Sequence, residues 1–455
     1  MEIKPLLTGL LSLLLYPSAH AQMQADGYKG IWFTLGQPSA YGDKYSGGLG
    51  TYTANHVPMA VYAPQARKTF FVFGGTPSAT ERTLQIMVSY YDHRSGMLPK
   101  PIILLEKTGV NDPHDNPSIN IDHQGYIWIF VSGRNTRRPG SIYKSNFPYD
   151  ITSFTKILED DITYPQPWPM APDKFIHLFT RYTNGRELYW TTSTNGLQWA
   201  TPQKLAGFGG HYQISTRHQQ TIFTAFNYHP NGDVDKRTNI YLLMSSSHGQ
   251  KWTNIDHIPL PTPITKSVND ALVHNYESEG KRVYLNDLNT DKNGNPVILA
   301  VISRDHRPGP QGNPREWVIW KRQNNQWVSR TICTSSHNYD MGSIYIKGKH
   351  WTVIGPTQTG PQRWGTGGEM AIWSSHDEGN TWSMTRQLTQ NSAYNHSYAR
   401  RPLNAHKDFY AFWGDGHADT LSPSKLYFTT KRGIVYQLPY QMTTSFTKPI
   451  KYKAP

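Results

Sequence analysis

Cysteine is almost absent from this chain of 455 residues: Cys333 is the only one, so no disulfide can form within the chain. Charged residues are scarce at 17%, and after the first residues no long segment keeps the hydrophobic period of a helix. A protein without disulfides that is not built from helices needs a large core of strands. The chain is long enough to supply one.

The N-terminus predicts export. Lys4 precedes an apolar run over residues 6–15, which is too short to span a bilayer, and Ala19-His20-Ala21 then offers small residues at the two positions that a signal peptidase recognises. We therefore expect a signal peptide over residues 1–21, cleavage before Gln22, and a periplasmic or secreted mature protein over residues 22–455. No cysteine lies near the cleavage point to carry a lipid anchor, so no membrane attachment is expected.

Aromatic residues and turn-forming residues are abundant. Aromatics make up 13% of the chain, and there are 37 glycines and 32 prolines. Aromatic and β-branched residues favour strands, whereas Gly, Pro, Asn and Asp favour tight turns. The composition predicts many short strands, and the segments with the strongest pattern are 69–73, 126–131, 175–180, 240–244, 296–302, 316–322, 350–354 and 408–413.

The formal net charge is +13. Such a charge suits nucleic acid, anionic lipid or an anionic glycan, but the Lys and Arg residues are scattered and no nucleic-acid motif is present. A generally basic surface that keeps the protein soluble is the simpler explanation for much of the charge. An acidic polysaccharide is the expected partner; no nucleic acid or membrane is expected.

A degenerate repeat predicts the fold. Ser375-x-Asp377-x-Gly379-x-x-Trp382 matches the Asp-box hairpin, in which Asp caps a turn, Gly takes a backbone angle that other residues resist, and Trp fills the seam between blades. Two weaker copies keep Gly and Trp but lose the Asp: Thr192-x-Thr194-x-Gly196-x-x-Trp199 and Ser245-x-Ser247-x-Gly249-x-x-Trp252. We predict an all-β fold, a single seven-bladed β-propeller over residues 22–455, with seven blades favoured over six.

Several clusters are too rich in polar and aromatic residues to be simple turns. The candidate site residues in them are Asn55 and His56 (cluster 51–58), His114 and Asn116 (cluster 112–117), Arg134, Tyr164 (cluster 163–168), Arg181, His211 (cluster 210–213) and Tyr228. Each has an ordinary structural alternative: the histidines can cap turns, the arginines can pair with carboxylates of neighbouring blades, and the tyrosines can pack.

These clusters, together with residues 43–49 and 404–413, resemble the BNR-4 repeat-containing carbohydrate-active proteins, from about residue 27 to residue 438. The resemblance implies a seven-bladed propeller and two possible activities. One is that of the ulvan lyases of polysaccharide lyase families 24 and 25. The other is that of the α-L-rhamnosidases of glycoside hydrolase family 145, which release rhamnose from glucuronic acid on arabinogalactan. Both substrates contain uronic acid next to rhamnose.

The lyase hypothesis uses His114 and Tyr164 for proton transfer and Arg181 for the uronate carboxylate. An elimination needs exactly those three tasks: neutralising the carboxylate, removing the adjacent proton and protonating the departing oxygen. Tyr228 matches a further lyase site residue. Arg134, however, stands where the resemblance places a second lyase histidine.

The rhamnosidase hypothesis, which we rank first from the sequence, makes His56 the only essential proton-transfer residue. The resemblance places that histidine on the opposite face of the propeller from His114, with Asn55 beside it. An imidazole can give and take a proton near neutral pH, and no obvious pair of carboxylates suggests an ordinary glycosidase.

A third hypothesis is a non-catalytic glycan-binding propeller. A sialidase is a poor match, because the Arg-Ile-Pro motif of that family is absent. We expect a monomer without a cofactor. His337, His396, His406 and His417 lack the tight spacing of a metal site, so no metal is expected.

Overall fold

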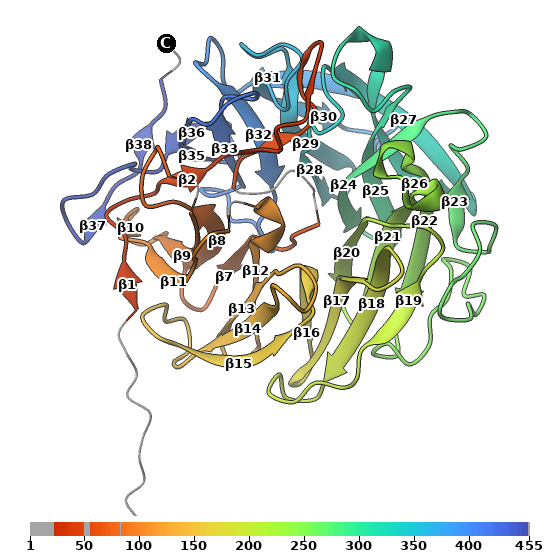
Figure 1. Ribbon diagram of the computed structural model, residues 1–455, viewed down its shortest axis with the longest axis horizontal. Helices are drawn as coiled ribbons and strands as arrows, with labels where there is room; N and C mark the ends of the chain where they lie inside the picture. Colours follow the sequence, from red (N-terminus) through yellow and green to blue (C-terminus); the bar gives the residue numbers. More distant parts are fainter. Residues whose placement is uncertain (1–21, 50–54, 82, 111, 454–455) are drawn as a thin grey trace, which may run out of the picture.

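The computed structural model describes residues 22–49, 55–81, 83–110 and 112–453; the expected signal peptide lies outside them. Its sheets are arranged around a central axis, and the chain passes once around the ring, so that the first and last sheets become neighbours (Figure 1). The helical elements of the described chain are four single turns: η1 (Pro113–Asp115), η2 (Pro230–Gly232), η3 (Val234–Lys236) and η4 (Pro310–Gly312). None of its helices is long and apolar enough to cross a membrane.

Five sheets are four-stranded antiparallel meanders in which each strand pairs with the next along the chain. They are β12–β15 (Pro117–Ile121, Ile127–Val131, Gly140–Ser145, Phe154–Asp160), β16–β19 (Thr163–Met170, Lys174–Tyr182, Arg186–Ser193, Gln203–Ala206), β20–β23 (Gln213–His218, Thr221–Tyr228, Thr238–Ser245, Leu272–His274), β24–β27 (Arg282–Thr290, Pro296–Ser303, Arg315–Gln323, Gln326–Ser335) and β28–β31 (Ser343–Lys347, His350–Gln358, Glu369–Ser375, Ser383–Gln387).

Two larger sheets close the ring. One is five-stranded, in the order β32 (Asn395–Arg400), β33 (Ala411–Gly416), β35 (Leu426–Thr429), β36 (Val435–Gln437) and β38 (Ile450–Lys451). The other is seven-stranded and combines β7 (Ala60–Ala63), β8 (Lys68–Gly75), β9 (Leu84–Asp92) and β11 (Ile102–Lys107) with β1 (Met23–Gln24), β2 (Gly30–Ile31) and β34 (Pro423–Ser424). Because β2 pairs with β34, the N-terminal and C-terminal parts of the chain share this sheet.

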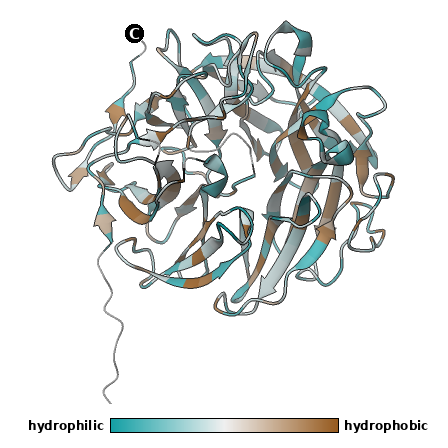
Figure 2. Ribbon diagram, in the orientation of Figure 1, coloured by the Kyte–Doolittle hydropathy of each residue, from teal (hydrophilic) through white to brown (hydrophobic). Residues whose placement is uncertain are grey.

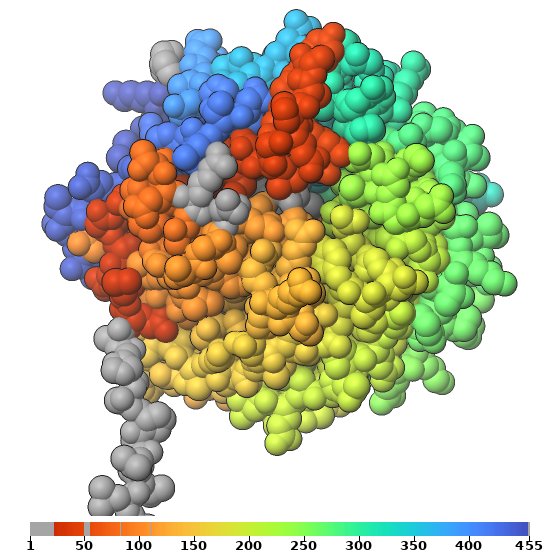
Figure 3. All heavy atoms as spheres, in the orientation of Figure 1, coloured from red at the N-terminus to blue at the C-terminus, as the bar shows by residue number. Residues whose placement is uncertain are grey.

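Three two-stranded pairs complete the strands: β3 (Phe33–Thr34) with β6 (Ser46–Gly47), β4 (Pro38–Ser39) with β5 (Gly42–Asp43), and β10 (Leu98–Pro99) with β37 (Phe446–Thr447). The segment that carries β3–β6 lies across one face, between the C-terminal strands and the middle of the chain (Figure 3). There Asp419 accepts a hydrogen bond from the Asp43 N–H at 2.8 Å, and the Tyr45 ring meets the Tyr339 ring at 4.8 Å.

The all-β propeller is thus confirmed, but its blades are not seven of one kind. Six sheets in the described chain are regular four- or five-stranded blades, rather than the seven predicted. Where a seventh regular blade would lie, strands from both ends of the chain merge into the seven-stranded sheet. The repeat signature marks only three hairpins, so the other blades could not be counted from it. Of the expected strands, that at 408–413 begins later, at Ala411.

The most hydrophobic residues lie mainly in the strands, and the loops are mostly hydrophilic (Figure 2). The strands with both faces buried, such as β22 and β25, are buried at every position, because each blade packs between two others. Burial of both faces produces nearly continuous apolar runs in the sequence, such as Pro296–Ser303. The first strand of each sheet lies nearest the axis and contacts the first strand of the preceding sheet, from β7 through β12, β16, β20 and β24 to β28.

The three Asp-box hairpins have the same geometry. Gly196, Gly249 and Gly379 have φ of 73°, 80° and 80°, and a serine Oγ accepts the N–H of each at 2.8, 3.0 and 2.9 Å. In the first copy the serine is Ser193 and not Thr192, so the predicted register there is wrong by one residue. Asn195 takes the part of the Asp: its Oδ1 accepts two backbone N–H groups at 2.9 Å, as Asp377 does in the intact copy.

The hairpin tryptophans fill seams between sheets, as predicted. The Trp199 ring meets the Phe130 ring of β13 at 5.8 Å, and the Trp252 ring meets the Trp190 ring of β18 at 5.6 Å. Trp382 packs against a core cluster that includes Ile319 of β26. These hairpins therefore stabilise the contacts between blades.

We expect Gly379→Ala to lower the free energy of unfolding by about 2–4 kcal/mol. A Cβ there would lie 2.6 Å from Trp351 and 2.7 Å from Ile319, in a left-handed backbone conformation. Gly348→Ala is the matched control, because Gly348 is also left-handed but has open space around it, and it should cost about 1 kcal/mol. Urea unfolding measures both; equal costs would show that the seam tolerates the methyl group.

Candidate functional site

Side-chain hydrogen bonds fix how the axial strands lie relative to each other. Ser118 Oγ and Asn120 Nδ2 of β12 donate to the carbonyls of Pro165 and Pro167 in β16, at 2.6 and 2.9 Å. Gln166 Nε2 donates in turn to the Gln213 carbonyl of β20 at 2.8 Å. All three bonds join residues 47 positions apart, so the strands run in the same direction and begin at the same end. The residues that begin these strands therefore gather at one end of the axis.

His114 lies at this end, in η1 just before β12. Its Nδ1 forms a short hydrogen bond with the Asp112 carboxylate, whose Oδ1 also accepts the His114 backbone N–H at 3.0 Å. Burial lowers the pKa of His114, against the influence of Asp112, so the imidazole is neutral near pH 7. With Nδ1–H donating to Asp112, the lone pair of the ring lies on Nε2.

Asp112 also holds two arginines. Arg138 Nη2 lies 2.6 Å and Arg134 Nη1 3.3 Å from Asp112 Oδ2. Burial alone would raise the pKa of Asp112, but the bonds from His114 and Arg138 outweigh it and hold that pKa well below its usual range. Asp112 is consequently a permanent anion that orients His114. Arg134, 37% exposed in its side chain, extends to the Tyr182 ring, 5.3 Å from its guanidinium carbon.

Tyr164 lies at the centre of the group. It is the second residue of β16 and has a left-handed φ of 56°, with its N–H donated to Ser132 Oγ at 3.0 Å. Its ring contacts three others: the His56 ring at 5.3 Å, the His114 ring at 5.5 Å and the Tyr212 ring at 5.6 Å. A strained conformation held by its surroundings is typical of functional positions.

His56 belongs to the same group, which corrects the expectation that it lies on the face opposite His114. Its Nε2 is 3.0 Å from the His114 carbonyl oxygen, and the residue is fully buried. Burial lowers its pKa to about 3. His56 and His114 come together because His56 lies shortly before β7, and β7 contacts β12. The spacing of the two histidines in the sequence does not show this.

The two candidate asparagines are buried in the same region of the fold. Asn116 donates from Nδ2 to the Pro113 carbonyl at 3.1 Å and so fixes the turn that carries His114. Asn116 Oδ1 and Asn55 Nδ2 are buried polar atoms without a hydrogen-bond partner. Buried polar atoms are normally satisfied, so both atoms are available to a bound ligand or water.

Tyr212, Arg186 and Arg237 complete the group, and the sequence did not single them out as site residues. Tyr212 comes directly before β20, and its ring lies 5.8 Å from the Arg186 guanidinium carbon and 4.9 Å from that of Arg237. Burial opposes ionisation, yet the charges of Arg186 and Arg237 lower the pKa of Tyr212. The only sequence signal was the position of Tyr212 within the cluster 210–213.

The neighbouring His211, a predicted substrate-binding residue, is turned into the protein. Its Nδ1 donates to the Asn227 carbonyl at 2.9 Å, and its Nε2 accepts the Phe208 N–H at 3.2 Å. Burial lowers its pKa to about 4. Tyr228 packs on the same Phe208, 5.2 Å between ring centroids. Both residues thus support the loop that presents Tyr212.

Arg181, expected to bind the uronate, is engaged elsewhere. Its Nη2 lies 2.6 Å from Asp160 Oδ2 and its Nε 3.1 Å from the Asp161 carbonyl oxygen, both at the outer edge of the neighbouring blade. It lines a cavity of about 380 Å³ together with His177 and Trp199. None of the group around Tyr164 lines this cavity. The structure therefore brings together Asn116, His56, His114, Tyr164 and Arg134, but not Arg181.

A second cavity of about 370 Å³ lies at the other end of the axial strands. It is lined by the last residues of β7, β12, β16 and β20, and its polar members include Asp122, His123, Arg217 and Asn404. The two ends of one set of strands thus carry two different surfaces.

Comparison with known proteins identifies the family and supports the fold. The model of the BNR repeat-containing family matches residues 78–335, which is more than half of the chain, so the chain belongs to this family of β-propeller proteins. The chain is similar to an ulvan lyase of Nonlabens ulvanivorans, 22% identical over 328 residues, which cover 61% of this chain and 66% of the relative.

It is also similar to an ulvan lyase of family 25 from Pseudoalteromonas sp. strain PLSV, 22% identical over 53% of this chain and 58% of the relative. The chain thus spans between half and two thirds of the length of these curated relatives. Among solved structures, an ulvan lyase of polysaccharide lyase family 25 bound to -[GlcA(1-4)Rha3S]- has a TM-score of 0.70 at 16% identity, covering 90% of this chain and 96% of that one. The polysaccharide lyase Uly1 has a TM-score of 0.58 at 11% identity, covering 92% and 97%. These likenesses show the fold.

His177, in the cavity of Arg181, predicts a pH dependence of stability. It is fully buried between the Phe130 and Phe179 rings, neither ring nitrogen has a hydrogen-bond partner, and burial lowers its pKa to about 3. The unfolded chain binds a proton here below about pH 6.5 and the folded one does not, so stability is lost as the pH falls from about 6.5 towards 3.

His177→Phe should reduce this slope by about 1.4 kcal/mol per pH unit between pH 6 and 4. Urea unfolding at several pH values measures it. Phe130→Leu is the control, since it changes the packing around His177 without removing a titratable group and should leave the slope unchanged. A slope that is the same in the parent and in His177→Phe would contradict the assignment.

Proposed function

We propose that this protein is a polysaccharide lyase that cleaves a uronate-containing polysaccharide of the ulvan type by β-elimination. The observation that carries the proposal is the contact of the Tyr164 ring with the His114 and Tyr212 rings, beside the guanidinium groups of Arg186 and Arg237. These two guanidinium groups make the field at this end of the axis favour negative charge, and they lower the pKa of the buried Tyr212 phenol against the effect of burial. A uronate carboxylate, and the anion formed when its neighbouring proton leaves, need such a field.

The remaining tasks of an elimination fall to residues in contact with each other. His114 is a neutral imidazole oriented by Asp112, and it accepts the proton adjacent to the carboxylate. Tyr164, whose ring lies against both His114 and Tyr212, donates a proton to the departing glycosidic oxygen. Arg134 and Arg186, which both lie near the Tyr182 ring, hold the carboxylate in place of Arg181. The ulvan lyases to which the chain is similar support this class of substrate.

The rhamnosidase hypothesis has less support. A fully buried His56 with a pKa of about 3 and a bond to a backbone carbonyl is poorly suited to exchange protons with a sugar. Two carboxylates that an ordinary glycosidase could use are engaged in other contacts: Glu369 accepts hydrogen bonds from Thr389 and Ser392, and Glu279 pairs with Lys281. Export, expected from residues 1–21, would bring the lyase to a polymer outside the cytoplasm.

The decisive assay incubates the protein with ulvan and follows the ultraviolet absorbance of the unsaturated uronate. We expect His114→Ala and Tyr164→Phe each to lower the rate by about two to four orders of magnitude, as for loss of a general acid or base. His56→Gln, which can still bond to the His114 carbonyl, should retain most of the activity. Rhamnose released from gum arabic without unsaturated product, and lost in His56→Gln, would support the hydrolase instead. Binding without any product would indicate a glycan-binding protein.

A second pair of variants tests which arginine holds the carboxylate. Arg186→Ala should lower kcat/KM by about tenfold to a hundredfold, the effect of losing one charge-assisted hydrogen bond. Arg181→Ala is the matched control: it lies on the same blade but pairs with Asp160, so kcat/KM should change less than about threefold. A larger loss of kcat/KM in Arg181→Ala than in Arg186→Ala would assign the binding of the carboxylate to Arg181.

A further inference from the structure

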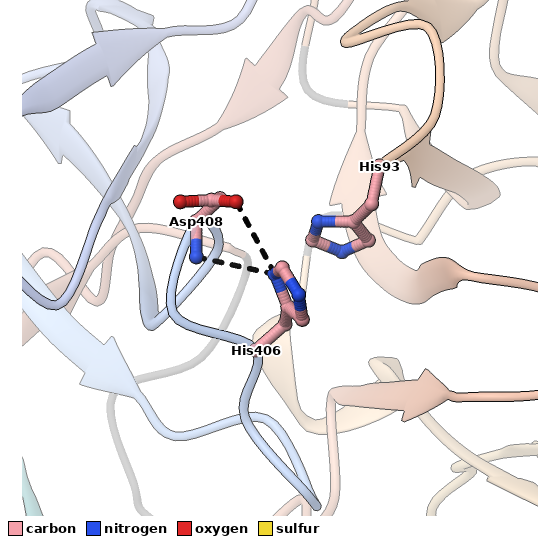
Figure 4. A group of neighbouring side chains, drawn as sticks. All are labelled: His93, His406 and Asp408. Atoms are coloured by element: carbon pink, nitrogen blue, oxygen red, sulfur yellow. Dashed lines mark hydrogen bonds and ion pairs between the residues drawn. The ribbon is translucent and has the colours of Figure 1, made fainter.

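Three metal-ligating side chains meet where the ring closes. His93 directly follows β9 of the seven-stranded sheet, and His406 and Asp408 belong to the loop between β32 and β33 of the C-terminal sheet. One ring nitrogen of each histidine and one carboxylate oxygen of Asp408 all lie within 4.8 Å of one another. Figure 4 shows the His93 ring facing His406 and Asp408 across a small gap.

The histidines are held in place by their surroundings. The two imidazole centroids are 3.9 Å apart, and the Tyr62 ring lies 5.1 Å from His93 and 4.8 Å from His406. Thr69 Oγ1 is 2.8 Å from His93 Nε2 and so fixes that ring. His93 Nδ1, in contrast, is buried without a hydrogen-bond partner, which is uncommon for a buried polar atom and leaves it free to bind a ligand.

We propose that His93, His406 and Asp408 bind one divalent transition-metal ion, most suitably Zn²⁺, with water as the fourth ligand. Two imidazoles and a carboxylate are an ordinary zinc ligand set. Ligand atoms of a tetrahedral zinc site lie about 3.3 Å apart, and the Asp408 side chain, 50% exposed, can rotate to close the gap. None of the three residues belongs to the group around Tyr164.

The ion would tie the first part of the ring to the last. The two segments already touch there: the Tyr62 N–H donates to the Leu403 carbonyl and the Leu403 N–H to the Ala60 carbonyl, both at 2.9 Å. A propeller without disulfides depends on such contacts to keep its ends together. A metal bound only by the folded chain stabilises it by mass action.

The test measures zinc bound to the full-length protein after dialysis, together with thermal unfolding in Zn²⁺, in Mg²⁺ and in a chelator. We expect about one zinc ion per chain and a Tm several degrees higher in Zn²⁺ than in the other two. His93→Ala, His406→Ala and Asp408→Asn should each abolish this difference and the bound zinc. Asp408→Asn changes an exposed side chain and so tests the site in a chain that still folds.

His376→Ala is the control. His376 and His350 form another imidazole pair, with their Nδ1 atoms 2.8 Å apart, but within one blade, so zinc content should not change. Zinc that remains bound in His93→Ala and Asp408→Asn, zinc that disappears in His376→Ala, or a parent chain that takes up none, would each overturn the proposal.

Discussion

The parallel alignment of the axial strands is the constraint on which the rest of this structure depends. Side chains of one strand donate to the backbone of the next, from Ser118 to Pro165 and from Gln166 to Gln213. These bonds replace the backbone ladder that separate blades cannot form with each other. They set the start of every axial strand at the same end, and therefore decide which loops share a surface.

The candidate site follows from this alignment. His114, Tyr164 and Tyr212 each stand at or just before the start of an axial strand, in three successive blades, and their rings touch because the strands start together. Arg186 begins β18 and Arg237 directly precedes β22, and both add positive charge to the group. Each of these three blades thus contributes a residue or two to the candidate site.

The other two surfaces show how the same architecture serves different ends. Arg181 and His177 lie in a seam between blades, where the arginine pairs with Asp160 and the histidine is held by aromatic rings. His93, His406 and Asp408 lie at the closure, where residues more than 300 positions apart in the chain meet. Histidines and arginines with the same side chains thus lie in the candidate site, in a seam between blades or at the closure of the ring, according to the strand end that carries them.

The sequence by itself determined the all-β propeller and the Asp-box hairpins around Gly196, Gly249 and Gly379, because these depend on local turn chemistry and strand periodicity. It also singled out His114 and Tyr164 as candidates, because polar and aromatic residues gather just before their strands. Only the tertiary structure decided which strands form the closing sheet and that His56 lies beside His114. It also decided that Arg181 pairs with Asp160, and that Tyr212 and Arg186 join the group around Tyr164. These depend on which strand ends become neighbours when the ring closes, and contacts between residues far apart in the chain leave no periodic trace in it.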